Sequence, residues 1–167
     1  RGLFPLREVS VIGARGREGK TTVVVGAAIA VAIAHSLARL NPPTNRSVVI
    51  YSAEDDRRQY ARKIAAQVSL LGTAQADLVT RRLLVPELDS EDMAPFRALV
   101  TMADRKPIGT GTDTALVEAI TPLMQSDAPP ILLVFETAST LSEAEEDNAG
   151  YRTLVICLKR VARALNV

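Results

Sequence analysis

Short runs of consecutive apolar residues alternate along the chain with longer segments in which apolar residues recur every three or four positions. Three of the runs, Val9–Ile12, Val48–Ser52 and Ile131–Phe135, predict buried strands. A fourth, Arg82–Val85, predicts a short edge strand that leads into a proline. Since strands separated by helices are typical of parallel sheets, the pattern predicts an α/β fold with a mostly parallel sheet.

Four longer segments predict helices between and after these strands. They are Lys20–Arg39, Asp56–Leu71, Leu116–Met124 and Asp147–Leu165. In the second helix the expected apolar face is Ala61, Ile64, Ala65, Val68 and Leu71, and in the last it is Leu154, Cys157, Leu158, Val161 and Leu165. The stretch 87–112 is the least regular, and in it we expect one short helix at Phe96–Ala103.

Length and composition limit the function classes. A chain of 167 residues with 47% apolar and 23% charged residues fits one globular domain spanning 1–167. A net charge of +1 shows no overall excess that would attract nucleic acid or membranes, although local basic patches are compatible with it. The apolar stretch Val23–Ala34 is shorter than the roughly 20 residues of a membrane span, and no secretory signal is visible. With Cys157 as the single cysteine, we expect a cytoplasmic protein without disulfides.

The loop after the first predicted strand has the residues of a phosphate-binding loop. The pattern Gly-x-x-x-x-Gly-Lys-[Ser/Thr] places Ala14 at its first position and Gly19, Lys20 and Thr21 at its last three. Backbone N–H groups of such a loop surround an anion, and the following helix adds the positive end of its dipole. Lys20 can reach the β- and γ-phosphates and the Thr21 hydroxyl can bind Mg²⁺. The expected nucleotide-binding residues are Gly13, Ala14, Arg15, Gly16, Arg17, Glu18, Gly19, Lys20, Thr21 and Thr22.

Carboxylates follow two of the other predicted strands. Glu54 comes just after the second strand, where ligands of parallel sheets bind, and can accept a proton from attacking water. An acidic start of the next helix is the alternative, and Asp55 and Asp56 are assigned mainly to capping. Glu136 ends the third strand, where a carboxylate can orient Mg²⁺, or can be an ordinary strand-terminal acid.

Three blocks of the sequence resemble the RepA-like replicative helicase ATPases of the RecA/DnaB-type branch of P-loop NTPases. They are "LFPLREVSVIGARGREGKTT", "VVIYSAEDDRRQYARKIAAQ" and "ILLVFETASTLSEAEEDNAG". The resemblance implies a three-layer RecA-like fold, with Lys20 and Thr21 in the Walker A loop, Glu54 as catalytic glutamate and Glu136 as the Walker B acid. Arg62 resembles a basic residue that follows this glutamate, and the stretch 145–148 resembles an acidic segment of the family. ATP and Mg²⁺ are the implied ligands.

The resemblance also implies an assembly and a partner. Members of the family form hexameric rings around single-stranded DNA, so we expect a homo-oligomer that acts on DNA, without a membrane. Glu136 stands where aspartate is usual, and Ala14 where glycine is usual. Members continue with a sensor strand and an arginine finger after the position of Val167. We therefore expect this chain, unlike the intact protein, to be a domain truncated at its carboxyl end that is monomeric or weakly associating and hydrolyses ATP slowly or not at all. The alternatives are a P-loop kinase and a nucleotide-dependent interaction module without turnover.

The remaining candidates have simpler interpretations. We expect His35 at the surface or in packing, and Tyr51 and Tyr60 in packing. Cys157 is expected in the core. The cluster of Lys159, Arg160 and Arg163 either complements a helix dipole or contacts nucleic acid. The segment "GTGTDT" at 109–114 is expected to be a loop that ends in a Thr112 or Asp113 cap.

Overall fold

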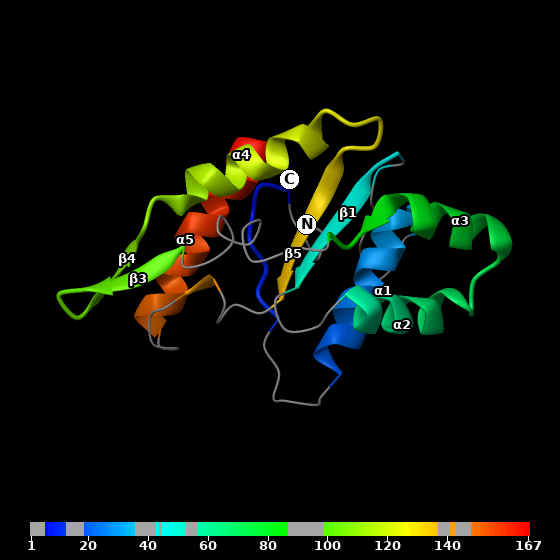
Figure 1. Ribbon diagram of the computed structural model, residues 1–167, viewed down its shortest axis with the longest axis horizontal. Coiled ribbons are helices and arrows are strands. Elements are labelled where there is room, and N and C mark those ends of the chain that lie inside the picture. The colour runs from blue at the N-terminus through cyan, green and yellow to red at the C-terminus, as the bar shows by residue number, and fades with distance from the viewer. Residues whose placement is uncertain are drawn as a thin grey trace.

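A parallel sheet of three strands forms the centre of the computed structural model, which describes residues 6–12, 19–35, 43, 45–52, 57–86, 99–136, 141–142 and 148–167. The strands are β1 (Ser47–Ser52), β2 (Leu83–Leu84) and β5 (Pro130–Glu136), in the order β2-β1-β5. Residue Val49 of β1 pairs with Leu84 on one side and with Leu133 on the other. This arrangement confirms the predicted α/β fold, and it confirms the strands predicted at residues 48–52 and 131–135 (Figure 1).

Side chains of successive strand residues enter two different cores, because strand residues alternate between the faces of a sheet. Val49 and Tyr51 belong to one cluster of buried residues, and Val48 and Ile50 belong to the other. Phe135 of β5 packs on the first cluster, and its ring stacks on that of Tyr51 with 5.4 Å between the centroids. The central strand β1 is therefore covered on both faces, which explains its continuous run of apolar residues.

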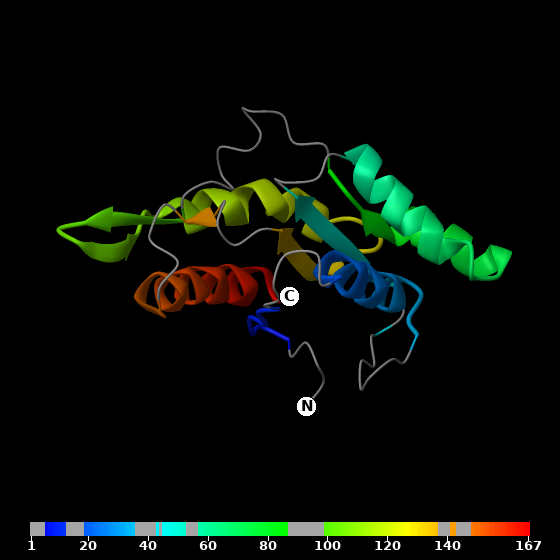
Figure 2. The ribbon, with the colours of Figure 1, turned by 90° about the horizontal axis from the view of Figure 1, so that it is seen from below.

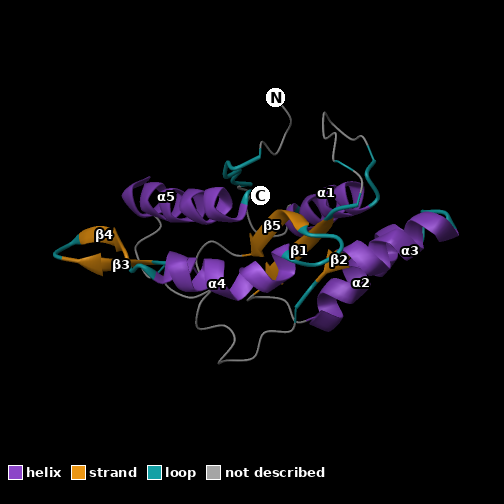
Figure 3. Cartoon of the chain, turned by 90° about the horizontal axis from the view of Figure 1, so that it is seen from above, coloured by secondary structure: helices purple, strands orange, loops and turns teal. Residues whose placement is uncertain are grey.

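Helices cover the two faces of the sheet and complete a three-layer structure (Figures 1, 2 and 3). The helices are α1 (Lys20–Ala32), α2 (Arg57–Val68), α3 (Thr73–Arg82), α4 (Thr112–Met124) and α5 (Asn148–Leu165). Helices α1, α2 and α3 pack against the cluster that contains Val48, and α4 and α5 pack against the cluster that contains Val49. No helix within the described residues combines the length and the apolar character that a membrane crossing requires.

Helix α1 is shorter than the sequence predicts. It ends at Ala32 instead of Arg39, because Ala34 turns into the left-handed region at φ 54° and the His35 N–H donates to the Ala30 carbonyl at 2.8 Å. His35 is exposed, as expected. The residues 36–40 lie outside the described part of the chain.

The helix predicted at 56–71 is confirmed as α2, and a second helix follows it. Helix α2 ends at Val68, and α3, which the sequence analysis did not predict, follows from Thr73. The predicted apolar face of α2 is partly wrong, because Ala61 and Ala65 are exposed. The completely buried side chain of α2 is Tyr60, which confirms its packing role.

The strand predicted at Val9–Ile12 is wrong. This segment is irregular, and the side chain of Val11 is 63% exposed. Contacts just before it hold the chain to the end of α5: the Arg7 N–H donates to the Val167 carbonyl at 2.6 Å, and Glu8 forms an ion pair with Lys159 at 2.6 Å. The segment is thus tied to a helix instead of a strand of the sheet.

The described part of the predicted helix Phe96–Ala103 is a strand. It is β3 (Val100–Ala103), which forms an antiparallel hairpin with β4 (Lys106–Gly109) beside α5. Asp104 and Arg105 make the turn with φ angles of 50° and 61°. Two positive φ angles are typical of the type I′ turn that joins closely paired strands.

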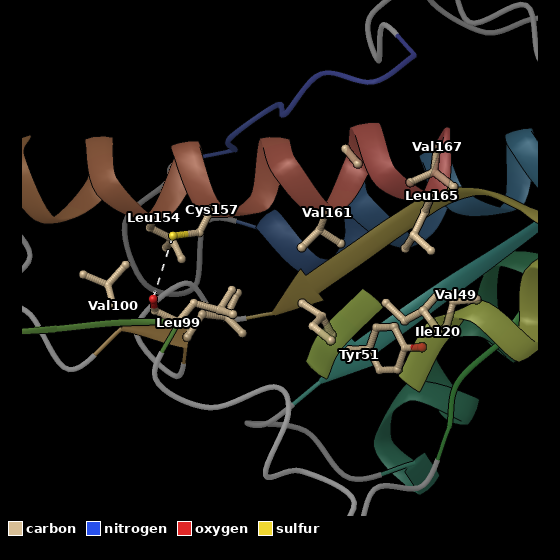
Figure 4. Packing of buried hydrophobic residues seen from close by; sticks show 13 residues of the cluster. Val49, Tyr51, Leu99, Val100, Ile120, Leu154, Cys157, Val161, Leu165 and Val167 are labelled. Carbon is tan, nitrogen blue, oxygen red and sulfur yellow. Dashed lines mark hydrogen bonds between the residues drawn. The ribbon is translucent and has the colours of Figure 1, made fainter. Parts of the chain in front are cut away.

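The core between the hairpin and α5 contains the single cysteine (Figure 4). Cys157 is 3% exposed, and its thiol donates to the Leu99 carbonyl at 3.8 Å. Burial is the main cause that raises the pKa of the Cys157 thiol, and the nearby Asp113 carboxylate adds to it. The expected core role of this cysteine is confirmed, and its raised pKa keeps it in the unreactive thiol form.

Candidate functional site

The N-cap and first turn of α1 carry the four described residues of the predicted phosphate loop. Gly19 is the N-cap residue, and its φ of 78° is in the left-handed region that favours glycine. Lys20 and Thr21 are half-buried, whereas Thr22 is exposed. The first turn contains no acidic residue, so no carboxylate on it offsets the positive end of the helix dipole.

The rest of α1 anchors this turn to the protein. Its apolar residues pack on the sheet, and those that are buried are Val25, Ala27, Ala28, Ile29, Ala30, Val31 and Ala32. A helix whose later turns are buried this completely holds its first turn in a fixed position. The apolar sequence after Lys20 therefore fixes the position of the first turn of α1, which follows the predicted phosphate loop.

Glu136 lies at the carboxyl end of β5. It pairs in register with Ser52, the last residue of β1, so the two central strands end at the same level. The alternation along β5 turns Glu136 toward the same face as Leu132 and Val134, which is the face covered by α1. Glu136 is 9% exposed, an unusual degree of burial for a carboxylate outside a functional or paired environment.

A hydrogen bond joins these two parts of the chain. The hydroxyl Oγ1 of Thr21 donates to Oε1 of Glu136 at 2.6 Å, across 115 positions in the sequence. A short bond to a carboxylate is among the stronger hydrogen bonds of proteins. The structure thus brings together Thr21 and Glu136, the two residues that the sequence predicted as metal ligands.

The hydroxyl of Thr21 and the carboxylate of Glu136 fit a magnesium ion whose other ligands are phosphate oxygens and waters. Mg²⁺ prefers oxygen ligands and is usually bound through one or two protein groups, with substrate phosphates and waters completing its shell. Thr21 and Glu136 supply a hydroxyl and a carboxylate beside the positive end of α1. No cluster of three or more His, Cys, Asp or Glu side chains suited to a metal occurs in the described ranges.

Gln67 is a further residue at this site, and the sequence analysis missed it. Its Nε2 donates to the Thr22 carbonyl at 3.1 Å and so ties α2 to the first turn of α1. Its other side-chain atom, Oε1, would lie 3.1 Å from a Cβ atom placed on Gly26. A small residue at position 26 therefore leaves room for this amide. No periodicity or motif in the sequence identifies a glutamine with this role.

Several predicted site residues lie outside the described part of the chain. They are Gly13, Ala14, Arg15, Gly16, Arg17, Glu18 and Glu54, together with residues 145–147 of the acidic stretch. Asn148 is the exposed first residue of α5. Arg62 is described, and its side chain is exposed on α2.

The loop predicted at 109–114 is shorter in the structure: Gly109 ends β4, Thr112 begins α4, and only residues 110 and 111 connect them. The predicted side-chain cap is wrong, because the N-cap residue of α4 is Gly111 at φ 82° and no side chain caps the helix. The Thr110 hydroxyl instead accepts a hydrogen bond from the Thr112 N–H at 3.4 Å. Asp113 interacts with Arg160 at 3.6 Å, so this carboxylate links α4 to α5.

An α/β domain with a Gly-Lys-Thr helix start, whose threonine contacts the acid at the end of a parallel strand, defines the class of P-loop nucleotide-binding proteins. A family model described as an AAA domain matches residues 1–167. The chain belongs to this AAA domain family, which makes it a P-loop AAA-type ATPase domain. No curated protein and no solved structure matches it.

Proposed function

We propose that this domain binds and hydrolyses ATP with Mg²⁺ as the motor domain of a RepA-like ATPase that acts on single-stranded DNA. The observation that carries the proposal is the hydrogen bond of 2.6 Å between Thr21 and Glu136, which joins the phosphate-loop threonine to a strand-terminal acid. Membership of the AAA domain family supports the nucleotide part of the proposal. The helicase-like part rests on the resemblance of the three sequence blocks.

The chain's own residues would act on the nucleotide in distinct ways. Lys20 would bind the β- and γ-phosphates. Thr21 and Glu136 would hold Mg²⁺, which would supply positive charge to balance the charge on the phosphates. Glu54 orients the attacking water and accepts its proton.

The binding step is tested with a fluorescent ATP analogue titrated in the presence of Mg²⁺. Lys20→Ala removes a charged hydrogen-bond donor to the phosphates, which is worth about 1.5–3 kcal/mol, so the affinity should fall by roughly tenfold or more. Lys106→Ala is the matched control, since it removes an equal charge from the exposed hairpin strand β4. Equal affinity of the Lys20 variant and the wild type would refute the phosphate-loop assignment.

The hydrolysis step is tested with Glu54→Gln. This variant should keep its affinity for the analogue and lose phosphate release, because an amide cannot accept the proton of water. Glu118→Gln, an exposed change on α4, is the control. Binding without turnover in the wild type, under all conditions including added DNA, would instead identify a nucleotide-dependent interaction module.

The assembly is tested by light scattering combined with the ATPase assay. An arginine finger from a neighbouring subunit is worth about 10³–10⁵ in rate in this chemistry, so slow turnover by the isolated chain should rise when subunits associate. We propose a ring of identical subunits that single-stranded DNA stimulates. A rapid turnover that does not depend on protein concentration or DNA would contradict this assembly.

A further inference from the structure

The outer face of α5 carries a row of positive charges without a single acidic residue on the helix. The cationic residues of α5 are Arg152, Lys159, Arg160 and Arg163. At 100° per residue they lie on the side opposite the buried residues Leu154, Cys157, Val161 and Leu165. From the first to the last cation the row is roughly 16 Å long at 1.5 Å per residue.

Two of these cations are free to bind an external anion. Within the described ranges, Arg152 and Arg163 form no ion pair or hydrogen bond through their side chains. Lys159 is paired with Glu8, and Arg160 with Asp113 at 3.6 Å. The Arg160 side chain is still 67% exposed, so its guanidinium keeps open donor positions.

The row is a local feature, because the whole chain has a net charge of only +1. Ile156, 45% exposed, lies between the cations on this face. Binding of a membrane does not fit, since a helix that enters a lipid surface needs a free apolar face and that of α5 is buried in the core. Cations spaced along a line, with an exposed apolar side chain between them, fit a strand of alternating phosphates and bases.

We propose that the outer face of α5, defined by Arg152, Ile156, Lys159, Arg160 and Arg163, binds the phosphate backbone of single-stranded DNA. The proposal rests on the proposed function, for which it names the DNA-contacting surface. Arg152 and Arg163 supply the strongest contacts, because no internal carboxylate competes with the phosphates for them.

The test measures binding of a fluorescent oligothymidine to the full chain by anisotropy at several salt concentrations. The double variant Arg152→Ala/Arg163→Ala should lower the slope of log affinity against log salt by about 1.4, at about 0.7 per phosphate contact. Near 50 mM salt the affinity should fall by roughly ten- to a hundredfold. The double variant Arg152→Lys/Arg163→Lys should keep the slope, since lysine also neutralises a phosphate.

The control is Arg58→Ala/Arg81→Ala, which changes the net charge equally but at exposed positions on α2 and α3, away from α5 (Figure 1). It should leave the slope and affinity unchanged. Wild-type slopes in the Arg152/Arg163 alanine variant, an equal loss in the control, or equally tight binding of polyglutamate would each overturn the proposal.

Binding of the ATP analogue, measured in the same proteins, separates this proposal from the proposed function. Normal nucleotide binding in every variant is expected. Nucleotide binding without any DNA binding overturns the α5 surface alone. DNA binding that depends on Arg152 and Arg163 without nucleotide binding supports the surface and overturns the ATPase proposal.

Discussion

Replacement of Thr21 by valine tests the contact at the centre of the site. Valine has nearly the shape of threonine and lacks the hydroxyl that donates to Glu136 at 2.6 Å. The carboxylate stays in place at 9% exposure and loses a donor that water cannot readily replace. The nucleotide-free protein should therefore be less stable, whether or not the domain is an ATPase.

The expected loss of stability follows from the type of hydrogen bond that Thr21→Val removes. A hydrogen bond to a charged group contributes about 1.5–3 kcal/mol to stability. For a chain of this size, each kcal/mol lowers the midpoint of thermal unfolding by roughly 2–4 °C, so the midpoint of Thr21→Val should fall by roughly 3–12 °C. Thr21→Ser keeps the hydroxyl and loses one methyl group, and should remain closer to the wild type.

Thermal unfolding followed by circular dichroism, with urea unfolding as a second measure, determines these differences. The double variant Thr21→Val/Glu136→Gln completes a double-mutant cycle, and its loss should be smaller than the sum of the two single losses, because Thr21→Val removes and Glu136→Gln weakens the same hydrogen bond. The reasoning is refuted if Thr21→Val unfolds at the wild-type midpoint, or if Thr21→Ser is destabilised as much as Thr21→Val.

Three other changes give predictions that do not depend on a ligand. Gly19→Ala should cost about 1–2 kcal/mol more in urea unfolding than Gly72→Ala, because both are N-cap residues that favour glycine over alanine but only Gly19 has a positive φ, of 78° against −71°; equal effects would contradict the backbone argument. Leu154→Ala, at 3% exposure, should cost about 2–5 kcal/mol, and Ile156→Ala, on the outer side of the same helix, less than about 1 kcal/mol; the reverse order would mean that α5 is packed on its other face. Burial raises the pKa of Tyr51 to about 12, so the folded protein holds this proton more tightly than the unfolded chain and stability should fall between about pH 10 and 12, by up to about 1.4 kcal/mol per pH unit. The fall should be shallower in Tyr51→Phe, and identical pH profiles of the two proteins would disprove it.

Elements with one dominant local pattern could be predicted from the sequence. The strand at 131–135 is a continuous apolar run, and α5 has a regular apolar stripe of Leu154, Cys157, Val161 and Leu165. Each of these patterns fits one kind of element: the stripe of α5 is buried, and the apolar residues of β5 are partly buried against the two cores. Their predicted bounds differ from the observed ones by one residue at most.

Elements whose stability comes from distant contacts could not be predicted. Helix α3 buries only Val79 within its ten residues, so it has hardly any periodic signal. The hairpin turn Asp104–Arg105 lacks the glycine that usually marks a type I′ turn. The apolar run Val9–Ile12 has the composition of a buried strand, and the contacts of Arg7 and Glu8 with the end of α5 are not visible in any local pattern.

The residues of the candidate site also fall into two groups: those that a local sequence pattern predicts, and those whose role depends on contacts between distant parts of the chain. Lys20, Thr21 and Glu136 follow from their position after a loop or a strand, because the phosphate-loop pattern has a known geometry. The contact of Gln67 with Thr22 depends on how two helices pack, and a sequence of one protein does not contain that information.

The separation of Thr21 from Glu136 has a consequence for the order in which the protein forms during synthesis. The ribosome releases α1, whose last eight residues except Gly26 are buried in the finished fold, before the strand β1 that covers them. The acid that holds the first turn of α1 is added 115 residues later, after β1, α2 and α3. At about 5–20 residues per second, the nascent chain spends several seconds or longer with this apolar helix incompletely covered. A chaperone that binds short apolar segments would protect α1 in that interval, and nucleotide could not yet stabilise the site.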